Sequence, residues 1–345
     1  MTRSEATTPT ARAVRRATPD SSTMPVTERI LGALPGPRWF WVAAWASVAL
    51  LRIGALVAVL NVTDPNGAGQ ASVGSALGQT VFAFLVLATL VGAPVLVRRV
   101  SELSPTLEAI APSEPSAHWF ARITNVVGPI VLVVLAVAAS LPSTIGDFGV
   151  AVALVDVVLL SIVLLPIMTF VWAYGSMLLG FDRLGRAALQ LDDFPQDRAL
   201  GLGPLGSVAM TGFSVLILAA APVLIFAGSD VTTVATSVTI LAVMVVLFVL
   251  SMVRLHGQLR VAKGGYVSMT RRLVAEAYGP VRVTTDLATL QANKPALDAA
   301  LALSDRAEKI LEWPIDERMV AWITVVVTGV ATGLVVRLIV QAIGA

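Results

Sequence analysis

The chain alternates between long apolar runs and shorter polar segments. Seven of the apolar runs are about 20 residues long, the length that an α-helix needs to cross the hydrocarbon core of a bilayer. The pattern predicts an all-α fold: a polytopic transmembrane helical bundle with seven spans. The predicted spans cover approximately residues 39–60, 78–97, 123–141, 149–172, 205–227, 232–252 and 319–343, and residues 142–148 are expected to form the turn between spans three and four.

The polar segments divide the chain into four parts. Residues 1–37 are rich in Thr, Ser, Pro and Arg and lack apolar periodicity, so we expect a disordered basic tail. Residues 38–254 are expected to form a six-span bundle, residues 255–317 a polar insert, and residues 318–345 the seventh transmembrane helix.

The polar insert carries its own helical pattern. Apolar residues recur at spacings of three and four, which predicts a helix with one apolar face. This face consists of Leu255, Leu259, Ala262, Tyr266, Met269 and Leu273. We expect Gly279-Pro280 to end this helix, and a second helix to run from Pro295, a residue suited to a first helical turn, to Glu312. The insert is therefore predicted to be an antiparallel helical hairpin.

Basic residues are confined to alternate polar segments. The segments before span one and between spans two and three, four and five, and six and seven hold 22 of the 24 Lys and Arg residues, whereas the three other loops hold none. By the positive-inside rule, the amino terminus and the hairpin are predicted to be cytoplasmic and the carboxyl terminus to be outside. Arg is far commoner than Lys, which is typical of a GC-rich bacterial genome and favours the bacterial cytoplasmic (inner) membrane, with the lipid bilayer as the main partner.

The hairpin offers a candidate surface for a partner. Its candidate residues are His256, Lys263, Arg271, Arg272, Trp313 and Asp316. One interpretation is a docking or self-association surface, because each helix has an apolar stripe with basic flanks. The other interpretation is that the two helices only cover each other, or that the basic flanks rest on anionic lipid headgroups.

Part of this pattern resembles a known group of proteins. His256, Lys263 seven residues later, and the sequence Trp313-Pro314-Ile315-Asp316 before a final span resemble a widespread group of uncharacterised multi-span prokaryotic membrane proteins. The sequence Leu200-Gly201-Leu202-Gly203-Pro204-Leu205-Gly206 at the entry to span five is similar too. The resemblance covers roughly the carboxyl-terminal 150 residues and implies no activity.

Three ionisable residues lie inside predicted spans: Arg52, Asp156 and Arg337. Arg52 lies about 20 Å from the cytoplasmic end of span one, and Asp156 about 10 to 12 Å from the outer end of span four. These depths coincide in a core about 30 Å thick, so we expect the two residues to pair in the bundle interior. Such a pair is either a proton- or ion-coupled site or a structural ion pair that fixes helix register.

Span seven carries a face of small residues. Gly329, Gly333 and Arg337 recur at every fourth position, and the two glycines form a GxxxG element that lets another helix approach closely. Span seven is therefore expected to pack tightly inside the bundle or to pair with a second copy of the chain.

Two further features bear on transport. Each of spans two to five contains one proline, which tends to kink a helix. These prolines are Pro94, Pro129, Pro166 and Pro222, and span five adds a stripe of hydroxyl groups from Ser207, Thr211 and Ser214. The hydroxyl groups either line a path through kinked helices or bond the backbone carbonyl groups of their own helix.

Composition argues against most catalytic chemistry. The chain is 56% hydrophobic and 13% charged, whereas soluble domains are about 25% charged. There is no cysteine, and the two histidines, His118 and His256, lie far apart and outside the predicted spans. We therefore expect no cofactor, no metal site, no nucleic-acid partner and no enzymatic activity.

Two classes of function remain open. The preferred class is a noncatalytic membrane scaffold or signalling subunit that binds a second copy or a cytoplasmic protein through its hairpin. The alternative is a channel-like or transport-related protein that uses Arg52 and Asp156 in the bundle interior. A water-filled cavity lined by these two residues with Thr211 and Ser214 would favour transport, whereas a dry bundle with an exposed apolar hairpin face would favour a partner.

Overall fold

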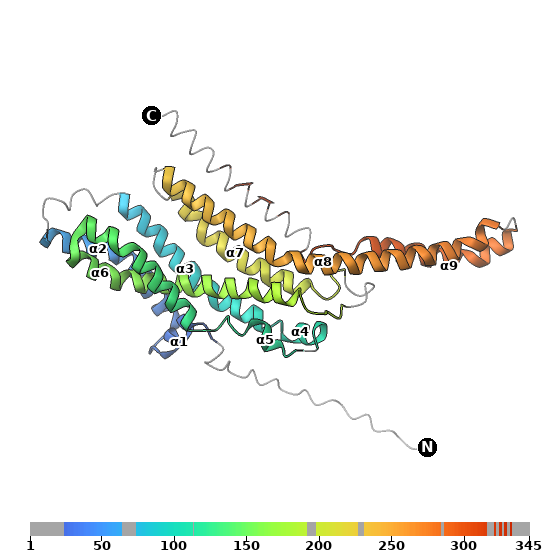
Figure 1. Cartoon of the computed structure of the whole chain (residues 1–345), viewed down its shortest axis with the longest axis horizontal. Helices are drawn as coiled ribbons and strands as arrows, with labels where there is room; N and C mark the ends of the chain where they lie inside the picture. Colours follow the sequence, from blue (N-terminus) through green and yellow to red (C-terminus); the bar gives the residue numbers. More distant parts are fainter. Residues whose placement is uncertain are drawn as a thin grey trace, which may run out of the picture.

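The computed structural model describes residues 24–63, 74–112, 114–191, 198–226, 231–283 and 286–315, with a few isolated positions between 321 and 332. All regular structure in this part of the chain is α-helical (Figure 1). The helices are α1 (Val26–Ala33), α2 (Arg38–Thr63), α3 (Gly74–Ser101), α4 (Ser104–Ile110), α5 (Ser116–Phe120), α6 (Val127–Leu184), α7 (Gly203–Phe226), α8 (Val231–Val283) and α9 (Leu287–Glu308).

Five stretches of the described chain are long and apolar enough to cross a membrane. They are Phe82–Ile110, Val127–Gly146, Gly149–Leu184, Gly203–Ala220 and Ala242–Val283. These helices indicate an all-α, membrane-embedded protein, in agreement with the predicted fold class at that level. The seventh predicted span, residues 319–343, lies almost entirely outside the described residues.

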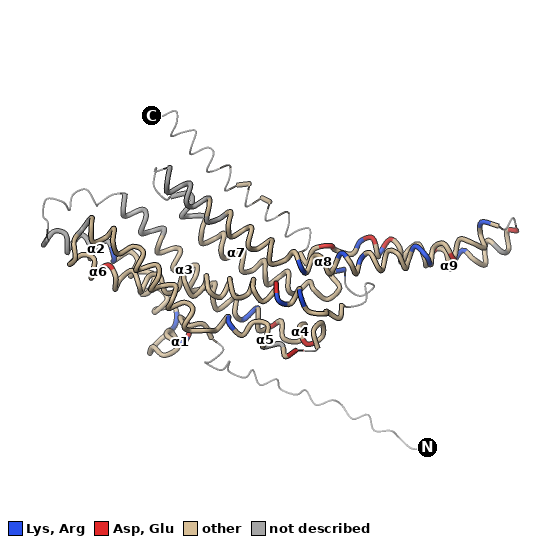
Figure 2. Tube along the Cα trace, in the orientation of Figure 1, with Lys and Arg blue, Asp and Glu red and all other residues tan. Residues whose placement is uncertain are grey.

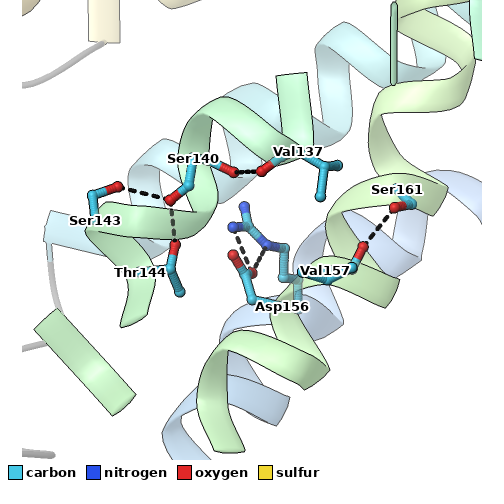
Figure 3. A network of polar contacts seen from close by, with 8 residues as sticks. Val137, Ser140, Ser143, Thr144, Asp156, Val157 and Ser161 are labelled. Atoms are coloured by element: carbon cyan, nitrogen blue, oxygen red, sulfur yellow. Dashed lines mark hydrogen bonds and ion pairs between the residues drawn. The ribbon is translucent and has the colours of Figure 1, made fainter. Parts of the chain in front are cut away.

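The predicted turn between spans three and four is present, since Val127–Gly146 and Gly149–Leu184 are separate apolar stretches, but its predicted start at Pro142 is wrong. Helix α6 continues through Pro142 and breaks only at Gly149, where φ is +82°, a value that favours glycine. Ser140, Ser143 and Thr144 donate hydrogen bonds to carbonyl oxygens of their own helix (Figure 3), so these polar residues do not need to leave it. Gly149 divides α6 into a first arm, residues 127–148, and a second arm, residues 149–184.

The two arms of α6 run back along each other. Trp172 on the second arm lies against Gly128 at the start of the first arm, where an added Cβ would overlap the indole ring. The indole Nε1 of Trp172 also donates a hydrogen bond of 2.9 Å to the carbonyl oxygen of Arg122. Contact between residues so far apart along α6 requires the arms to be antiparallel.

Helix α3 joins the two halves of the core, because it packs against α2, α6 and α7. In one cluster of buried side chains, Leu90 of α3 lies with Ala49 of α2 and Val163 of α6. In the other cluster, Leu96 of α3 lies with Phe213 of α7. The second cluster extends to α4, α5 and α8, so these elements share a single packed core.

The segment between α3 and α6, which the sequence marks only as polar, is folded. It contains α4 and α5 and buries several large side chains in the second cluster: Leu103, Leu107, Ile110, Trp119 and Phe120. The rings of Phe120 and Phe181 meet edge to face, with centroids 5.6 Å apart. The segment therefore covers one end of the core.

The predicted disorder of residues 1–37 is wrong for residues 26–33, which form α1. Leu31 of this helix is buried in the first cluster. The Arg29 guanidinium donates a hydrogen bond of 3.2 Å to the carbonyl oxygen of Thr124, which ties α1 to the turn before α6. The helix is too short for its apolar residues to give a periodic signal in the sequence.

Helix α8 continues past the predicted stop at Gly279-Pro280 and ends at Val283. Pro280 lies in the last turn, where its ring removes a single backbone hydrogen bond. Helix α9 packs back along the carboxyl-terminal part of α8 (Figure 1). We refer to residues 254–283 of α8 together with α9 as the helix pair.

The predicted bounds of the second helix of the insert are also wrong. Helix α9 begins at Leu287, eight residues before Pro295, which lies inside it, and ends at Glu308 instead of Glu312. The carboxylate of Asp286 accepts a hydrogen bond of 3.2 Å from the backbone N–H of Ala288 and caps the new start.

Charged residues are unevenly distributed over these helices. Figure 2 shows them gathered along the helix pair and beside α4 and α5, whereas long stretches of α2, α3, α6 and α7 carry almost none. The fold thus separates an apolar bundle from a charged helix pair that extends away from it.

Candidate functional site

Arg52 on α2 and Asp156 on the second arm of α6 form an ion pair. The Nε and Nη2 atoms of Arg52 lie 2.7 and 2.6 Å from Oδ1 of Asp156 (Figure 3). The two side chains are only 14% and 7% exposed. The structure thus brings together the two charges that their depths in the predicted spans had paired, and removing either partner would leave a buried charge uncompensated.

The hydroxyl groups around this ion pair bond the backbone. Ser161 donates a hydrogen bond of 2.6 Å to the carbonyl oxygen of Val157, and the hydroxyls of Ser140, Ser143 and Thr144 are likewise bonded to carbonyl oxygens (Figure 3). These hydroxyl groups therefore do not compete with the guanidinium of Arg52 for the carboxylate of Asp156.

The hydroxyl stripe of span five shows the same behaviour. Thr211 donates a hydrogen bond of 3.0 Å to the carbonyl oxygen of Ser207, and Ser214 donates one of 2.7 Å to that of Met210. Of the predicted kinks, Pro129 lies in the first turn of α6, where a missing N–H costs no helical hydrogen bond. Neither Arg52 nor Asp156 lines any of three crevices that lie between helices in the described part of the molecule.

A second candidate site is the junction where the chain leaves α9 and returns to the bundle. The backbone N–H of Leu311 donates a hydrogen bond of 2.9 Å to the carbonyl oxygen of Arg198. In return, Nε of Arg198 donates one of 3.0 Å to the carbonyl oxygen of Lys309. Gly206 in the first turn of α7 lies so close to Pro314 that an added Cβ would overlap the proline carbonyl oxygen.

Helix α8 contributes the other side of this junction. The imidazole of His256 stacks on the indole of Trp313, with ring centroids 4.3 Å apart and planes inclined by 15°. Nδ1 of His256 lies 2.7 Å from the carbonyl oxygen of Glu312, which requires a proton on Nδ1 to donate the hydrogen bond. Nζ of Lys263 lies 3.2 Å from Oε1 of Glu312.

The residues on which the expected resemblance rests, as far as they are described, meet at one place. His256, Lys263, Trp313 and the glycine-containing entry to α7 surround the same short segment, residues 309–315. Leu200 and Gly201 reach this point with positive φ angles of 52° and 85°. These contacts join α7, α8 and the end of α9 and so fix the helix pair to the bundle. We call the contacts of Arg198, Gly206, His256 and Lys263 with residues 309–315 the clasp.

Sequence reasoning missed two members of the clasp, Arg198 and Glu312, because their partners lie far away in the chain. The only sequence signal for Glu312 is its position beside the Trp-Pro junction, and Arg198 carried none. Asp316, predicted to belong to this surface, lies outside the described residues.

The predicted apolar face of the helix pair is only partly covered. Leu255 and Leu259 are fully buried in the core, but Met269 and Leu273 are each 39% exposed, and Val261 beside them is 78% exposed. The predicted basic residues flank this region: Arg271 approaches Glu308 of α9 at 3.9 Å, and Arg272 is exposed.

The exposed apolar residues of α8 form a row at every fourth position. The row consists of Gly257, Val261, Gly265, Met269 and Leu273. A Cβ added at either glycine would meet no atom within 4 Å, so both glycines face open space. Successive members of this row are neighbours on the helix surface, and the row winds gradually around α8 because four residues exceed one turn of 3.6 residues. Small residues in the row allow another helix to approach. We call this feature the α8 row.

The remaining predicted site cannot be located as a unit. Gly329 is described and has nothing within 4 Å of a Cβ added to it. Gly333 and Arg337 lie outside the described residues.

Within the described residues, no group of three or more His, Cys, Asp or Glu side chains is placed to hold a metal ion. Comparison with known proteins gives no matching family model, no matching curated sequence and no matching solved structure. The function is therefore inferred from the geometry alone.

Proposed function

We propose that the protein is a noncatalytic membrane scaffold or signalling subunit, which holds a rigid helix pair in the cytoplasm for a protein partner. The partner is a second copy of the chain or another cytoplasmic protein. The proposal includes seven spans in the inner membrane of a bacterium, with the amino terminus inside and the carboxyl terminus outside, as the distribution of basic residues favours.

The observation that carries this proposal is the combination of the clasp and the α8 row. The clasp fixes one end of the helix pair through the His256–Trp313 stack, the Lys263–Glu312 ion pair and the contact of Gly206 with Pro314. Beyond the clasp, the α8 row leaves apolar side chains exposed. A rigid helix with an exposed apolar row is a typical docking surface for an amphipathic helix.

A channel-like or transport-related role is less well supported. Its observation is the burial of Arg52 and Asp156, but these charges neutralise each other, and the three crevices described above have other residues in their walls. Ion flux into liposomes that contain the purified protein tests this alternative. Flux that is abolished by Asp156→Asn would favour transport over the scaffold.

The experiment for the scaffold uses site-specific crosslinking in living cells. A photo-reactive amino acid replaces Met269 in the α8 row or, as the matched control, the neighbouring exposed Ser268, which lies outside the row. We expect a defined adduct from position 269 and little or none from position 268. Equal adduct formation at both positions, or none at either, would contradict the proposal.

The same position distinguishes the two kinds of partner. Because the chain contains no cysteine, Met269→Cys introduces the only thiol. In isolated membranes treated with an added thiol oxidant, a disulfide-linked dimer in Met269→Cys, but not in Ser268→Cys, would identify the partner as a second copy. A photo-adduct whose added mass differs from that of a second copy of the chain, without the disulfide dimer, would show that the partner is a different protein.

A further inference from the structure

A crevice between the two arms of α6 and helix α8 has the features of a site for one amphiphilic molecule. Its volume is about 440 Å³, and most of its wall is apolar, with Leu132 on the first arm, Leu179 on the second arm and Leu250 on α8. Leu179 and Leu250 are more than half exposed, so the crevice opens on the outer surface of the bundle. That surface faces lipid if the helices cross the membrane as proposed above.

The length of the crevice is too great for a headgroup alone. Along α6 its wall runs from Val171 to Asp182, which at 1.5 Å per residue is about 16 Å. The polar interface on one side of a bilayer is only about 5 to 8 Å deep, the difference between the full thickness and the hydrocarbon core. An occupant that fills the crevice therefore needs a hydrocarbon part as well as a polar part.

The polar part of the crevice is positively charged. Arg122, in the turn before the first arm, lines the crevice, and its guanidinium has no hydrogen-bond or ion-pair partner among the residues that the structure describes. Asp182, the acidic residue in the wall, is already paired with Arg186 and with Arg254, the latter at 2.7 Å. Because Asp182 is shared by two arginines and Arg122 adds a further positive charge to the wall, the crevice has an excess of positive charge.

From these observations we propose that the crevice binds one anionic phospholipid, with an acyl chain against the leucines of α6 and α8 and its phosphate at Arg122. Attraction between interfacial arginines and anionic lipids is a general effect. The specific element here is an arginine, unpaired among the described residues, in the wall of a mostly apolar crevice of about 440 Å³. This inference uses the proposed membrane orientation but does not depend on the scaffold role.

Two substitutions test the two parts of the site separately. Arg122→Gln removes the unpaired cation, and its control is Arg260→Gln, an exposed arginine on α8 outside the crevice. Gly175→Leu fills the crevice from its wall, where an added Cβ meets no atom within 4 Å. The matched control is Gly54→Leu, at an exposed glycine on α2 that also has open space around it.

The measurement is native mass spectrometry of the delipidated full chain, titrated separately with phosphatidylglycerol and with phosphatidylcholine of the same chains. We expect the native protein to bind phosphatidylglycerol more tightly than phosphatidylcholine. Arg122→Gln should reduce this preference about fivefold, the factor that corresponds to the attraction of one interfacial arginine to anionic lipid. Gly175→Leu should weaken binding of both lipids. Both control variants should bind like the native protein.

Equal losses in Arg122→Gln and Arg260→Gln would overturn the proposal, because they would indicate diffuse attraction to the whole basic surface. Unchanged binding in Gly175→Leu would overturn it too. A second measurement needs no variant: a phosphatidylglycerol with a photo-reactive acyl chain is crosslinked to the native protein and the adducts are mapped. Adducts concentrated on residues 171–182 and 247–251 support the site, and adducts spread evenly over the exposed helices contradict it.

Discussion

The buried ion pair shows how a charge is accommodated inside an apolar bundle. Arg52 on α2 and Asp156 on α6 are both shielded from water. In place of water, two nitrogen atoms of Arg52 lie 2.6 and 2.7 Å from one carboxylate oxygen of Asp156. A pair of this kind contributes little net stability compared with apolar residues of the same volume, but losing one partner is costly. We therefore interpret the ion pair as a contact that fixes the register of α2 against α6.

Substitutions of this pair have a distinctive expected pattern. Arg52→Ala and Asp156→Ala should each lower the free energy of unfolding by about 3 to 5 kcal/mol, because each leaves an uncompensated buried charge. The exchanged pair, Arg52→Asp with Asp156→Arg, and the apolar pair, Arg52→Leu with Asp156→Leu, should lose much less. The measurement is thermal unfolding of the purified protein in detergent.

The control for this series is the exposed pair of Arg98 and Glu102, in which the Arg98 side chain is 81% exposed. Arg98→Ala should change the stability by less than about 1 kcal/mol. If the single and double variants of the buried pair were equally unstable, the two residues would not act as a pair.

The sequence predicts this pair well and the clasp poorly, for a physical reason. Charges inside apolar spans are so rare that each one is noticeable, and depth alone matches Arg52 with Asp156. The partners in the clasp, such as Arg198 and Lys309, are ordinary polar residues until the fold brings them together. Their contacts are visible only in three dimensions.

The clasp gives a prediction for glycine. Gly206→Ala places a methyl group on the carbonyl oxygen of Pro314, a backbone atom that cannot rotate away. We expect this variant to release residues 309–315 from α7 and to make the helix pair sensitive to a protease at low concentration. Gly257→Ala, where a Cβ meets no atom, is the control and should resist proteolysis like the native protein.

The sequence predicts well which long apolar segments are helices, but it predicts poorly where those helices begin and end. The apolar runs predict α2, α3, α7 and α8 correctly, because length and hydrophobicity suffice to identify a long apolar helix. The errors occur at Pro142, Pro280 and Pro295, each of which lies inside a helix. Packing against neighbouring helices can compensate for a single lost hydrogen bond, and the sequence does not display that packing.

The break in α6 depends on one glycine. Gly149 has a φ of +82° and a ψ of 171°, a region that essentially only glycine occupies and that costs another residue about 1 to 3 kcal/mol, so Gly149→Ala should destabilise the fold by about that amount. Gly146→Ala, three residues earlier within the helical part of the first arm, should be neutral or stabilising by about 0.5 to 1 kcal/mol. Thermal unfolding of both variants checks the pair, and equal destabilisation by both would place the break elsewhere.

The molecule as a whole combines an apolar bundle with a charged helix pair. Two buried clusters share α3, and the second continues through α8 into the clasp, so a single rigid path connects the bundle to the base of the helix pair. Beyond the clasp, the helix pair extends away from the bundle (Figure 1) and carries the exposed α8 row. A rigid bundle that carries an exposed helix pair is the arrangement expected of a scaffold.

The central claim is that the helix pair lies in the cytoplasm, and single cysteines introduced into this cysteine-free chain test it most directly. Intact cells that produce Met269→Cys or Gln70→Cys are treated with a membrane-impermeant maleimide, before and after permeabilisation. We predict labelling of Gln70→Cys in intact cells and of Met269→Cys only after permeabilisation. Labelling of Met269→Cys in intact cells would contradict the account.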